Sequence, residues 1–394
     1  MTQSTGTDIF SSFDQNKAIK HGLPPRAYIS NEFYELESDH LFAKSWTFAG
    51  FAHDLAHVGD ITPVQVAGKP LFLVRSSKNK IRAFHNVCRH RSLKLVSKPH
   101  NCKSLITCPY HRWSYNLDGE LRAAPFFGGQ KTELPEDFKL EDHGLIEVPC
   151  RLFQDWLFVN LNGDTASFES YLAPLEKQLT GFDLDGFFAV ASIEFTEIKT
   201  NWKFLMENFI EPYHVQFVHK KTTSQPLVEH YTICDGHCLG SGVNLSAGQQ
   251  VKAQEGTLAV SSRYLTLFPN FVLGIYYPDQ IGVHLNRPIS AGTTSQRRVI
   301  YLHKDSDQNP ETVENIRRLW ESVHKEDHEI CERLQEGRHS EVAEQGGILS
   351  PHWESSVRRF QELVANSIRP ALNKNSLQEK NNDRYNTTLA RFSP

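Results

Sequence analysis

Cys88-Arg-His90 and, seventeen residues later, Cys108-Pro-Tyr-His111 are the two segments that decide the fold of this chain. Each segment supplies one thiol and one imidazole. Such a set suits a two-iron, two-sulfur (2Fe-2S) cluster in which two thiolates hold one iron and two imidazoles hold the other. The neutral imidazoles raise the reduction potential to roughly −150 to +300 mV, against about −400 mV for an all-cysteine plant-type cluster. The two segments therefore predict a centre that accepts single electrons from a reductase or a ferredoxin.

Structural zinc is the alternative interpretation of these four residues, because zinc binds the same thiolates and imidazoles in a tetrahedron. Zinc-finger spacings usually place the two cysteines together and the two histidines together. Here each segment contributes one ligand of each kind, which favours the iron-sulfur cluster.

The composition limits the classes of partner. The chain has 394 residues, enough for two domains, and its net charge of −4 gives no indication of binding to nucleic acid or to an anionic membrane. No apolar run approaches the roughly 18 residues that cross a bilayer, and the polar N-terminus does not resemble a secretory signal. The five cysteines outside the cluster segments are expected to be reduced thiols, so we predict a cytoplasmic protein.

The first half of the chain is predicted to be rich in β-strands. Residues 1–30 are expected to form a loose arm and residues 31–42 a short helix, and residues 1–44 together are assigned to the second domain. Residues 45–163 contain short alternating runs separated by Gly and Pro, as in a small antiparallel β domain. Asp118-Gly119 within this domain is a strong hairpin signal. The cluster is expected at the tip of this domain.

The second domain, residues 164–394, is predicted to contain an antiparallel sheet covered by helices, so that the fold class of the chain is α+β. Strands are expected over residues 187–197 and within 264–289. Helices are expected over residues 168–180, 201–219, 311–338 and 356–371. Because the first domain is filled by its cluster, the second is expected to carry out the chemistry.

A second metal site is indicated by His214 and His219, which are five residues apart. On an ideal helix this spacing corresponds to about 140° of rotation, so the two side chains do not share a face. They can bind one ion only if the helix widens or breaks, and Pro212 is a local cause of irregularity. Two histidines with this spacing are otherwise ordinary core or solvent-exposed residues.

Asp327 is the candidate third ligand, because it falls on the apolar stripe of the helix predicted after Pro310. A carboxylate that points into a core must be paired or bind a metal. Two imidazoles and one carboxylate form the facial triad of non-haem Fe(II) oxygenases. An ion pair with a buried Arg or Lys is the alternative, and Glu326 and Glu329 are neighbouring carboxylates that rotate off the stripe. The stripe consists of Ile316, Leu319, Trp320, Val323, Ile330, Cys331 and Leu334.

Glu211 lies three residues before His214, so on a helical turn the two side chains would project from nearly the same side. Its carboxylate could then accept a hydrogen bond from the His214 ring and fix its orientation. A solvent-exposed helix residue is the alternative interpretation of this glutamate.

Taken in order, these motifs resemble the oxygenase (α) subunit of Rieske non-haem iron oxygenases, which include ring-hydroxylating and N-demethylating enzymes. The resemblance implies that Cys88, His90, Cys108 and His111 bind the Rieske cluster. It further implies that His214, His219 and Asp327 bind a mononuclear Fe(II). The motifs that carry it are Cys88-x-His90, Cys108-x-x-His111, Asn201-Trp-Lys, Glu207-Asn208, Glu211-x-x-His214-x-x-x-x-His219, Leu267-Phe-Pro-Asn270 and Glu326-Asp327-x-x-Ile-Cys-Glu332.

The resemblance also implies partners. Family members form head-to-tail rings, usually trimers, and on that basis Glu211 would bridge His214 to His111 of a neighbouring copy. The chain has no flavin, nicotinamide or plant-type cluster motif, so a separate reductase, with or without a ferredoxin, would supply electrons from NAD(P)H. O2 and a small organic compound are the implied substrates. Six cations around the cluster segments could attract an acidic electron donor, and these are Arg89, Arg91, Lys94, Lys98, Lys103 and Arg112.

Hydroxylation or dihydroxylation of a small aromatic compound is the first functional prediction. Monooxygenation or N-demethylation of a quaternary ammonium compound of the choline, betaine or carnitine type is the alternative, because Glu211 replaces the Asp that most of the family carries. Asn208 is expected near the iron. A Rieske electron carrier without oxygenase activity and a zinc-binding interaction protein are alternatives from other classes. The aromatic pocket candidates are Phe204, Phe209, Phe217, Tyr276 and Tyr277.

Overall fold

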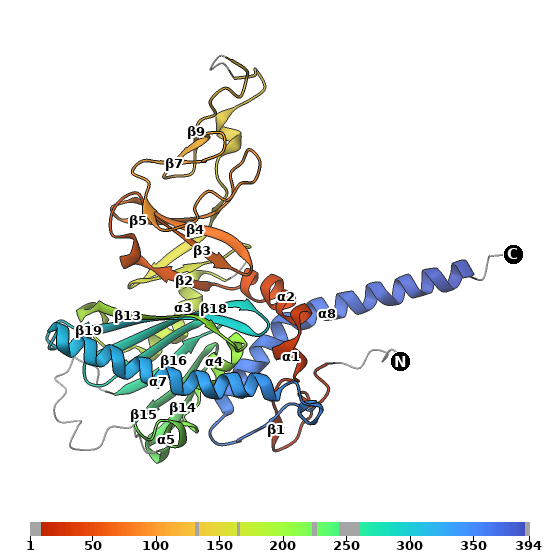
Figure 1. The fold of residues 1–394 in the computed structure, drawn as a ribbon. Coiled ribbons are helices and arrows are strands. Elements are labelled where there is room, and N and C mark those ends of the chain that lie inside the picture. Colours follow the sequence, from red (N-terminus) through yellow and green to blue (C-terminus); the bar gives the residue numbers. More distant parts are fainter. Residues whose placement is uncertain (1–8, 131–133, 164–165, 223–226, 244–260, 391–394) are drawn as a thin grey trace. The chain divides into compact units, whose positions relative to one another are not determined.

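The computed structural model describes residues 9–130, 134–163, 166–222, 227–243 and 261–390 (Figure 1). The chain forms two compact units, one of Phe42–Ala173 and one of Met1–Leu41 together with Pro174–Pro394. Every sheet pairing among the described residues is antiparallel and helices accompany the larger sheet, which confirms the predicted α+β class. The domain limits drawn from the sequence remain a proposal.

The Phe42–Ala173 unit is built on two sheets. Central strand β4 has the uninterrupted apolar run Leu71-Phe72-Leu73-Val74, which is buried along its whole length. Leu71 and Leu73 belong to one apolar cluster and Phe72 and Val74 to another, because successive side chains of a strand point to opposite faces. One sheet has the order β10-β5-β4-β3-β6 and the other β11-β12-β2. Their strands are β2 Thr47–Phe51, β3 Asp60–Val66, β4 Lys69–Ser77, β5 Lys80–His85, β6 His100–Asn101, β10 Glu147–Val148, β11 Cys150–Phe153 and β12 Trp156–Val159.

A third small sheet in this unit consists of β7 Leu105–Thr107, β8 Ser114–Asn116 and β9 Leu121–Ala123. Asp118-Gly119 connects the last two strands, as predicted. The Asn116 side chain accepts hydrogen bonds from the backbone N–H groups of Asp118 and Glu120 at 3.1 and 2.8 Å. Gly119 has a φ of +90°, and a Cβ there would lie 2.5 Å from the Phe84 ring, so the turn requires glycine.

The larger unit contains a seven-stranded antiparallel sheet with the order β13-β19-β18-β17-β16-β15-β14. Helices α4 and α7 pack against each other and against this sheet, α4 on β15, β16 and β18 and α7 on β13 (Figure 1). The sheet and these two helices form the framework of the larger unit. The strands are β13 Phe187–Ile198, β14 His230–Asp235, β15 Cys238–Val243, β16 Ser262–Leu267, β17 Phe271–Tyr276, β18 Gln280–Ser290 and β19 Thr293–His303.

The helical elements agree with four of the predicted segments in position but not always in length. The α-helices are α1 Arg26–Ile29, α2 Asn31–His40, α3 Phe168–Gln178, α4 Trp202–Ile210, α5 Val215–Val218, α7 Pro310–Gly337 and α8 Ser355–Ala390. The short 3-10 turns are Phe42–Lys44, Ala52–Leu55, Leu140–His143, Leu184–Gly186, Leu227–Glu229 and Glu341–Ala343. Within the described ranges, no helix combines the length and apolar character needed to cross a bilayer.

The prediction of a loose N-terminal arm is wrong for the described part of that segment. Phe10 and Phe13 are 1% and 2% exposed, and β1 Lys20–His21 pairs with β20 Ile348–Leu349. Arg369 of α8 holds Asp14 in an ion pair at 2.6 Å. Buried aromatic residues, scattered in an otherwise polar segment, fix the arm to its unit because each removes a large apolar area from water.

The single helix predicted over residues 201–219 is also wrong. Asn201 caps α4 by accepting a hydrogen bond from the Lys203 N–H at 3.0 Å, and α4 ends at Ile210. Glu211 is extended, because the residue before a proline is driven out of the helical region. His214 and His219 then flank the single turn of α5. The break precedes both histidines instead of separating them.

The predicted stripe of α7 needs one correction. Leu319 and Leu334 are 42% and 43% exposed, whereas the side chains buried beneath the helix include His324 and His328. The sheet side of α7 is therefore partly polar. The buried residues of the helix are Trp320, Val323, His324, His328, Cys331 and Gln335.

Candidate metal centres and active-site cavity

The two Cys-His segments form loops with the same backbone geometry. The Cys88 N–H donates to the Leu93 carbonyl and the Ser92 N–H to the Cys88 carbonyl. Cys108 makes the equivalent pair of bonds with Trp113 and Arg112. Ser92 and Arg112 have φ values of +56° and +62°, so both loops turn at the fourth residue after the cysteine. Two matching turns thus present two buried thiols, although the histidine follows by two residues in one loop and by three in the other.

The side chains of the two loops come together in a way that fits a cluster. The rings of His90 and His111 lie with their centroids 4.6 Å apart. His111 Nδ1 is buried and has no hydrogen-bond partner, although buried polar atoms nearly always have one. The Tyr115 hydroxyl lies 3.3 Å from Cys88 Sγ and accepts the Arg89 N–H at 3.0 Å. An unpartnered imidazole nitrogen beside two buried thiols suits a metal ligand.

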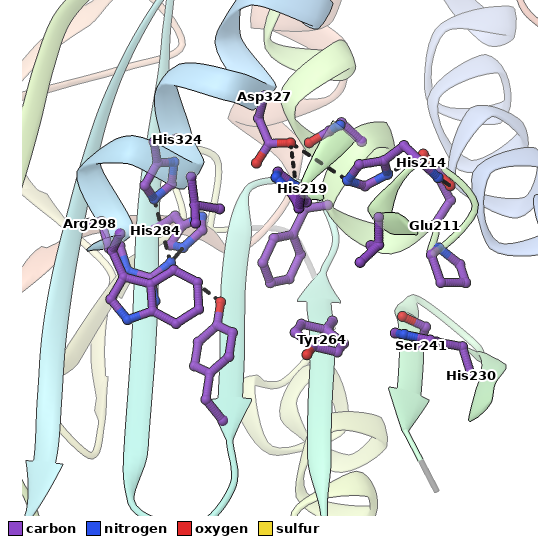
Figure 2. Close-up of a pocket in the computed structure, with 17 residues that line it drawn as sticks. Glu211, His214, His219, His230, Ser241, Tyr264, His284, Arg298, His324 and Asp327 are labelled. Atoms are coloured by element: carbon purple, nitrogen blue, oxygen red, sulfur yellow. Dashed lines mark hydrogen bonds and ion pairs between the residues drawn. The ribbon is translucent and has the colours of Figure 1, made fainter. Parts of the chain in front are cut away.

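His214, His219 and Asp327 are brought together as predicted. His214 Nε2 and His219 Nε2 lie 3.6 and 3.0 Å from Asp327 Oδ1, and the three ligand atoms lie within 4.8 Å of one another (Figure 2). The histidines come from the two ends of α5 and the aspartate from the middle of α7. Asp327 Oδ1 is buried without an aligned hydrogen bond. The three atoms converge as the ligands of one ion would.

The other nitrogen of each imidazole contacts a carboxylate. Glu211 Oε1 lies 2.5 Å from His214 Nδ1, and Glu326 Oε2 lies 2.8 Å from His219 Nδ1. If each Nδ1–H donates to its carboxylate, both Nε2 lone pairs remain free for a metal. Such carboxylate–histidine pairs orient metal-binding imidazoles and raise their basicity.

Glu211 contacts His214 as predicted, but through a turn and not along a helix. Its Oε2 accepts the backbone N–H groups of Tyr213 and His214. The carboxylate is therefore held by three N–H groups and is 12% exposed. Its position depends on the extended backbone before Pro212.

Glu326 is a functional candidate whose role was missed in the sequence. It was set aside because it rotates off the apolar stripe of α7. Its Oε2 nevertheless accepts the Thr222 hydroxyl at 2.8 Å and faces His219. The signal that could have found it is its position next to Asp327, because neighbouring helix residues diverge by about 100° and can flank a ligand that lies beside the helix.

The carboxylates control the protonation of the imidazoles. Burial lowers the pKa of His219, but the hydrogen bonds and charges of Asp327 and Glu326 outweigh burial and raise the pKa to about 9. Burial opposes protonation of His214 too, and Glu211 and then Asp327 raise its pKa overall. A cation that binds here must displace protons, so its affinity falls with decreasing pH.

A cavity of about 680 Å³, including its open mouth, adjoins the triad. Asn208, Phe209 and Tyr276 line it, as expected for candidate active-site residues. Phe204 instead stacks on Tyr28 in the core, and Phe217 is 56% exposed. Figure 2 shows Arg298, His284 and His324 grouped on one side of the triad. The remaining lining residues are Glu211, Pro212, His214, Val215, His219, His230, Ser241, Tyr264, Trp320, Val323 and Asp327.

Two family models match the chain. The Rieske 2Fe-2S domain matches residues 45–134, and the catalytic domain of the ring-hydroxylating α subunit matches residues 184–369. The chain therefore belongs to the Rieske oxygenase α subunits, and it is an oxygenase component. Members of this family carry a Rieske cluster and a mononuclear iron.

Individual relatives point to a branch within this family. The chain is 27% identical to the glycine betaine monooxygenase oxygenase subunit of Chromohalobacter salexigens, over 88% of this chain and 86% of that one. It is 28% identical to the carnitine monooxygenase oxygenase subunit of Escherichia coli K12, over 87% and 92%. The quaternary ammonium Rieske monooxygenase CntA with γ-butyrobetaine shares its fold, with a TM-score of 0.75, 23% identity and coverage of 90% and 98%. Quaternary ammonium monooxygenases are better supported as relatives than the aromatic hydroxylases predicted first.

Proposed function

We propose that this chain is the terminal oxygenase of a system that hydroxylates a carbon bound to the nitrogen of a small quaternary ammonium compound. The observation that carries this proposal is the convergence of two imidazole nitrogens and one carboxylate oxygen on an aromatic-lined cavity. Relatives named for glycine betaine and carnitine support the substrate class. The proposal therefore favours oxidation of a quaternary ammonium compound, the alternative drawn from the sequence, over the aromatic hydroxylation predicted first.

His214, His219 and Asp327 are the proposed ligands of a mononuclear Fe(II). The approach of both Nε2 atoms to Asp327 Oδ1, with each Nδ1 turned to a different carboxylate, supports this set. Cys88, His90, Cys108 and His111 are the proposed cluster ligands, supported by the orphaned His111 Nδ1. The chemistry that these groups supply when bound is reductive activation of O2, with electrons delivered singly.

The reaction balances as a monooxygenation. O2, NAD(P)H and one proton are consumed; one oxygen atom enters a C–H bond next to nitrogen and the other leaves as water. The resulting carbinolamine loses its C–N bond to give an amine and a carbonyl compound. An N-methyl group would therefore be released as formaldehyde.

The residues around the metal position and shield the reactants. Glu211 and Glu326 hold the two imidazoles in the orientation that metal binding needs. Asn208 lies on the cavity wall, where its amide can hydrogen-bond a reactant. The aromatic rings of the lining exclude water, which strengthens electrostatic interactions inside the cavity.

A separate reductase is the proposed electron donor, because the relatives are oxygenase subunits of monooxygenase systems. A homotrimer, or a multiple of it, is the proposed assembly. In that assembly Glu211 would contact His111 of a second copy, and its 12% exposure leaves part of the carboxylate accessible for such a contact.

Product analysis tests the proposed reaction. The holoprotein, a compatible reductase, NADH and O2 are incubated with glycine betaine, γ-butyrobetaine or choline. We expect substrate-dependent formaldehyde or trimethylamine, and neither product with Asp327→Ala. Formation of diols from arenes, with no C–N cleavage in any of the three compounds, would contradict the proposal.

A further inference from the structure

Arg298 is a buried cation that forms no ion pair with a carboxylate of the described residues. It lies on β19, is 1% exposed and lines the cavity (Figure 2). Its Nη1 contacts the Tyr276 hydroxyl at 3.3 Å, His284 Nε2 at 3.0 Å and His324 Nε2 at 3.5 Å. Its Nε and Nη2 have no hydrogen-bond partner. A guanidinium stays protonated in proteins. The N–H groups on Nε and Nη2 of this charged side chain can therefore still donate hydrogen bonds.

Asp327 acts on Arg298 through its charge but does not form an ion pair with it, and burial still lowers the pKa of the guanidinium. Burial, then the charge of Arg298, holds the pKa of His284 well below its usual value, and burial does the same for His324, with Arg298 acting in the same direction. Both histidines are therefore neutral acceptors. A buried charge without a counterion is strongly unfavourable, which indicates that an anion completes the site.

The aromatic rings near Arg298 are already covered by its guanidinium. The Cζ atom lies 3.8 Å from the Trp320 ring centroid and 5.1 Å from that of Tyr276. A quaternary ammonium group binds by placing its cation over such faces. This part of the cavity is consequently unsuited to the cationic end of a substrate.

Gly282 on the neighbouring strand β18 makes room for the guanidinium. A Cβ at this position would lie 2.4 Å from Arg298 Nη2 and 2.6 Å from its Cζ. Arg298 is thus held between a glycine on the sheet and the indole of α7. Gly282 and Trp320 therefore fix the position of the guanidinium at the cavity.

We propose that Arg298 binds the acid group of the substrate, so that the compound oxidised is an amino acid-like zwitterion and not a simple cation such as choline. This rests on the proposed function and specifies its substrate class. Asp327 and Glu211 line another part of the cavity, at the triad (Figure 2). With its carboxylate at Arg298, such a compound would extend its other end toward the triad.

Two matched pairs of compounds separate this inference from the proposed function. Glycine betaine and choline both carry a trimethylammonium group and differ in having a carboxylate or a hydroxymethyl group. Benzoate and benzyl alcohol show the same difference without the ammonium group. Binding of each compound to the anaerobic holoprotein is measured by titration calorimetry. We expect glycine betaine to bind at least about tenfold more tightly than choline.

Substitutions of Arg298 test whether its guanidinium causes the preference for glycine betaine over choline. Arg298→Gln should reduce the glycine betaine preference to less than about threefold, and Arg298→Lys should retain part of it because the charge stays while the paired donors are lost. Arg297→Gln is the matched control, because Arg297 is the next residue on the same strand and pairs with Glu194 of β13 at 3.5 Å. This control should leave the preference unchanged. Visible absorption of the cluster and the thermal midpoint report whether each variant folds.

The outcomes distinguish two kinds of failure. Choline that binds and is demethylated as well as glycine betaine would overturn the role of Arg298 but not the reaction. A preference for benzoate over benzyl alcohol, with no binding of either ammonium compound, would support the role of Arg298 and overturn the substrate class. The inference would be contradicted if Arg298→Gln still bound the carboxylate compound of a pair more tightly than the alcohol. It would also be contradicted if the unaltered protein showed no such difference in either pair. The compound pairs test it in the unaltered protein even if the variant does not fold.

Discussion

Each of the two histidines of the triad depends on a single carboxylate, but the two carboxylates differ in origin. Glu211 is held by backbone N–H groups of its own turn, whereas Glu326 reaches His219 from α7. Substitution of each glutamate by glutamine removes the charge and keeps an oxygen acceptor. Comparison of the two variants therefore distinguishes a carboxylate that orients a metal ligand from one that also carries electrons between subunits.

Glu211→Gln is expected to leave both metals bound and to slow turnover severely, by a factor of at least about 100. The neutral amide can still accept the His214 Nδ1–H but no longer holds a charged bridge to a second copy. Rapid mixing of the reduced protein with O2 and substrate measures the rate at which the cluster is oxidised. Turnover like that of the parent, at full iron content, would remove the bridging role.

Glu326→Gln is expected to act on the iron instead. Two backbone N–H groups keep an oxygen of residue 211 in place, whereas Glu326 is held by the Thr222 hydroxyl. A glutamine at 326 can therefore turn its NH2 group toward His219 and should weaken iron affinity by roughly 10–100-fold. Dialysis against graded concentrations of an iron chelator measures this affinity, with Glu211→Gln as the comparison. In protein reloaded with iron, cluster oxidation should proceed normally. An iron affinity equal to that of the parent would show that Glu326 is incidental.

The sequence indicated the proposed metal ligands but not the residues that surround them. Cys88, His90, His214 and Asp327 are recognisable because their spacing is tied to their chemistry. Arg298 carries no such local signal, because which face of β19 meets the cavity follows from a sheet of seven strands that join distant parts of the chain. Phe204 is a core residue, the alternative interpretation of the aromatic candidates, and Phe217 is exposed on the short turn of α5.

At the level of elements, α2 and α4 are joined by a fully buried ion pair. Lys203 Nζ lies 2.6 Å from Glu37 Oε1, both side chains are 0% exposed, and Trp202 Nε1 donates to Glu37 Oε2 at 3.0 Å. Burial acts against both charged forms, raising the pKa of Glu37 and lowering that of Lys203. The pair fixes the start of the helix that leads into the Glu211 turn.

Glu37→Leu is expected to destabilise the protein by about 3–5 kcal/mol, because it leaves the Lys203 ammonium buried without a counterion. The thermal midpoint of the larger unit should fall by roughly 10 °C. Adding Lys203→Met to this variant should restore more than half of the loss, since no charge is then buried. A single variant as stable as the parent would show that the pair contributes nothing at this position.

Element prediction failed where the chain departs from regular periodicity. Long amphipathic segments such as α7 were recovered almost to the residue, since 28 residues average out local noise. The break at Glu211 was foreseen as an irregularity, but its position depends on the steric effect of Pro212 on one preceding residue. The extent of α8, which continues to Ala390, exceeds the predicted end because apolar periodicity stops earlier than the helix.

At the level of the whole molecule, the switch from short strands to longer helices near residue 164 predicted two parts and the α+β class. Residues 9–41 lie in the same compact unit as residues 174–390, and the assignment of residues 1–44 to the second domain remains a proposal. That association depends on pairings such as β1 with β20, which join residues more than 300 positions apart. Such contacts leave no local trace in a single sequence.

The six cations around the cluster loops are all exposed, which leaves them available to an acidic electron donor. Exposed charges are screened within about 10 Å at 0.1 M salt. We therefore expect kcat/KM for the reductase to fall severalfold between about 50 and 300 mM NaCl. Replacing Lys94 and Lys98 by Gln should flatten this dependence, whereas Lys78→Gln in the β4–β5 turn should not. A parent protein indifferent to salt would count against electrostatic docking.

The account rests on two separate iron sites in one polypeptide, and metal analysis tests this most directly. Freshly isolated, anaerobically prepared protein should contain about three irons and about two acid-labile sulfides per chain. Asp327→Ala should retain the sulfides and the cluster spectrum and lose about one iron. Zinc in place of iron, or a third iron that persists in Asp327→Ala, would contradict the account.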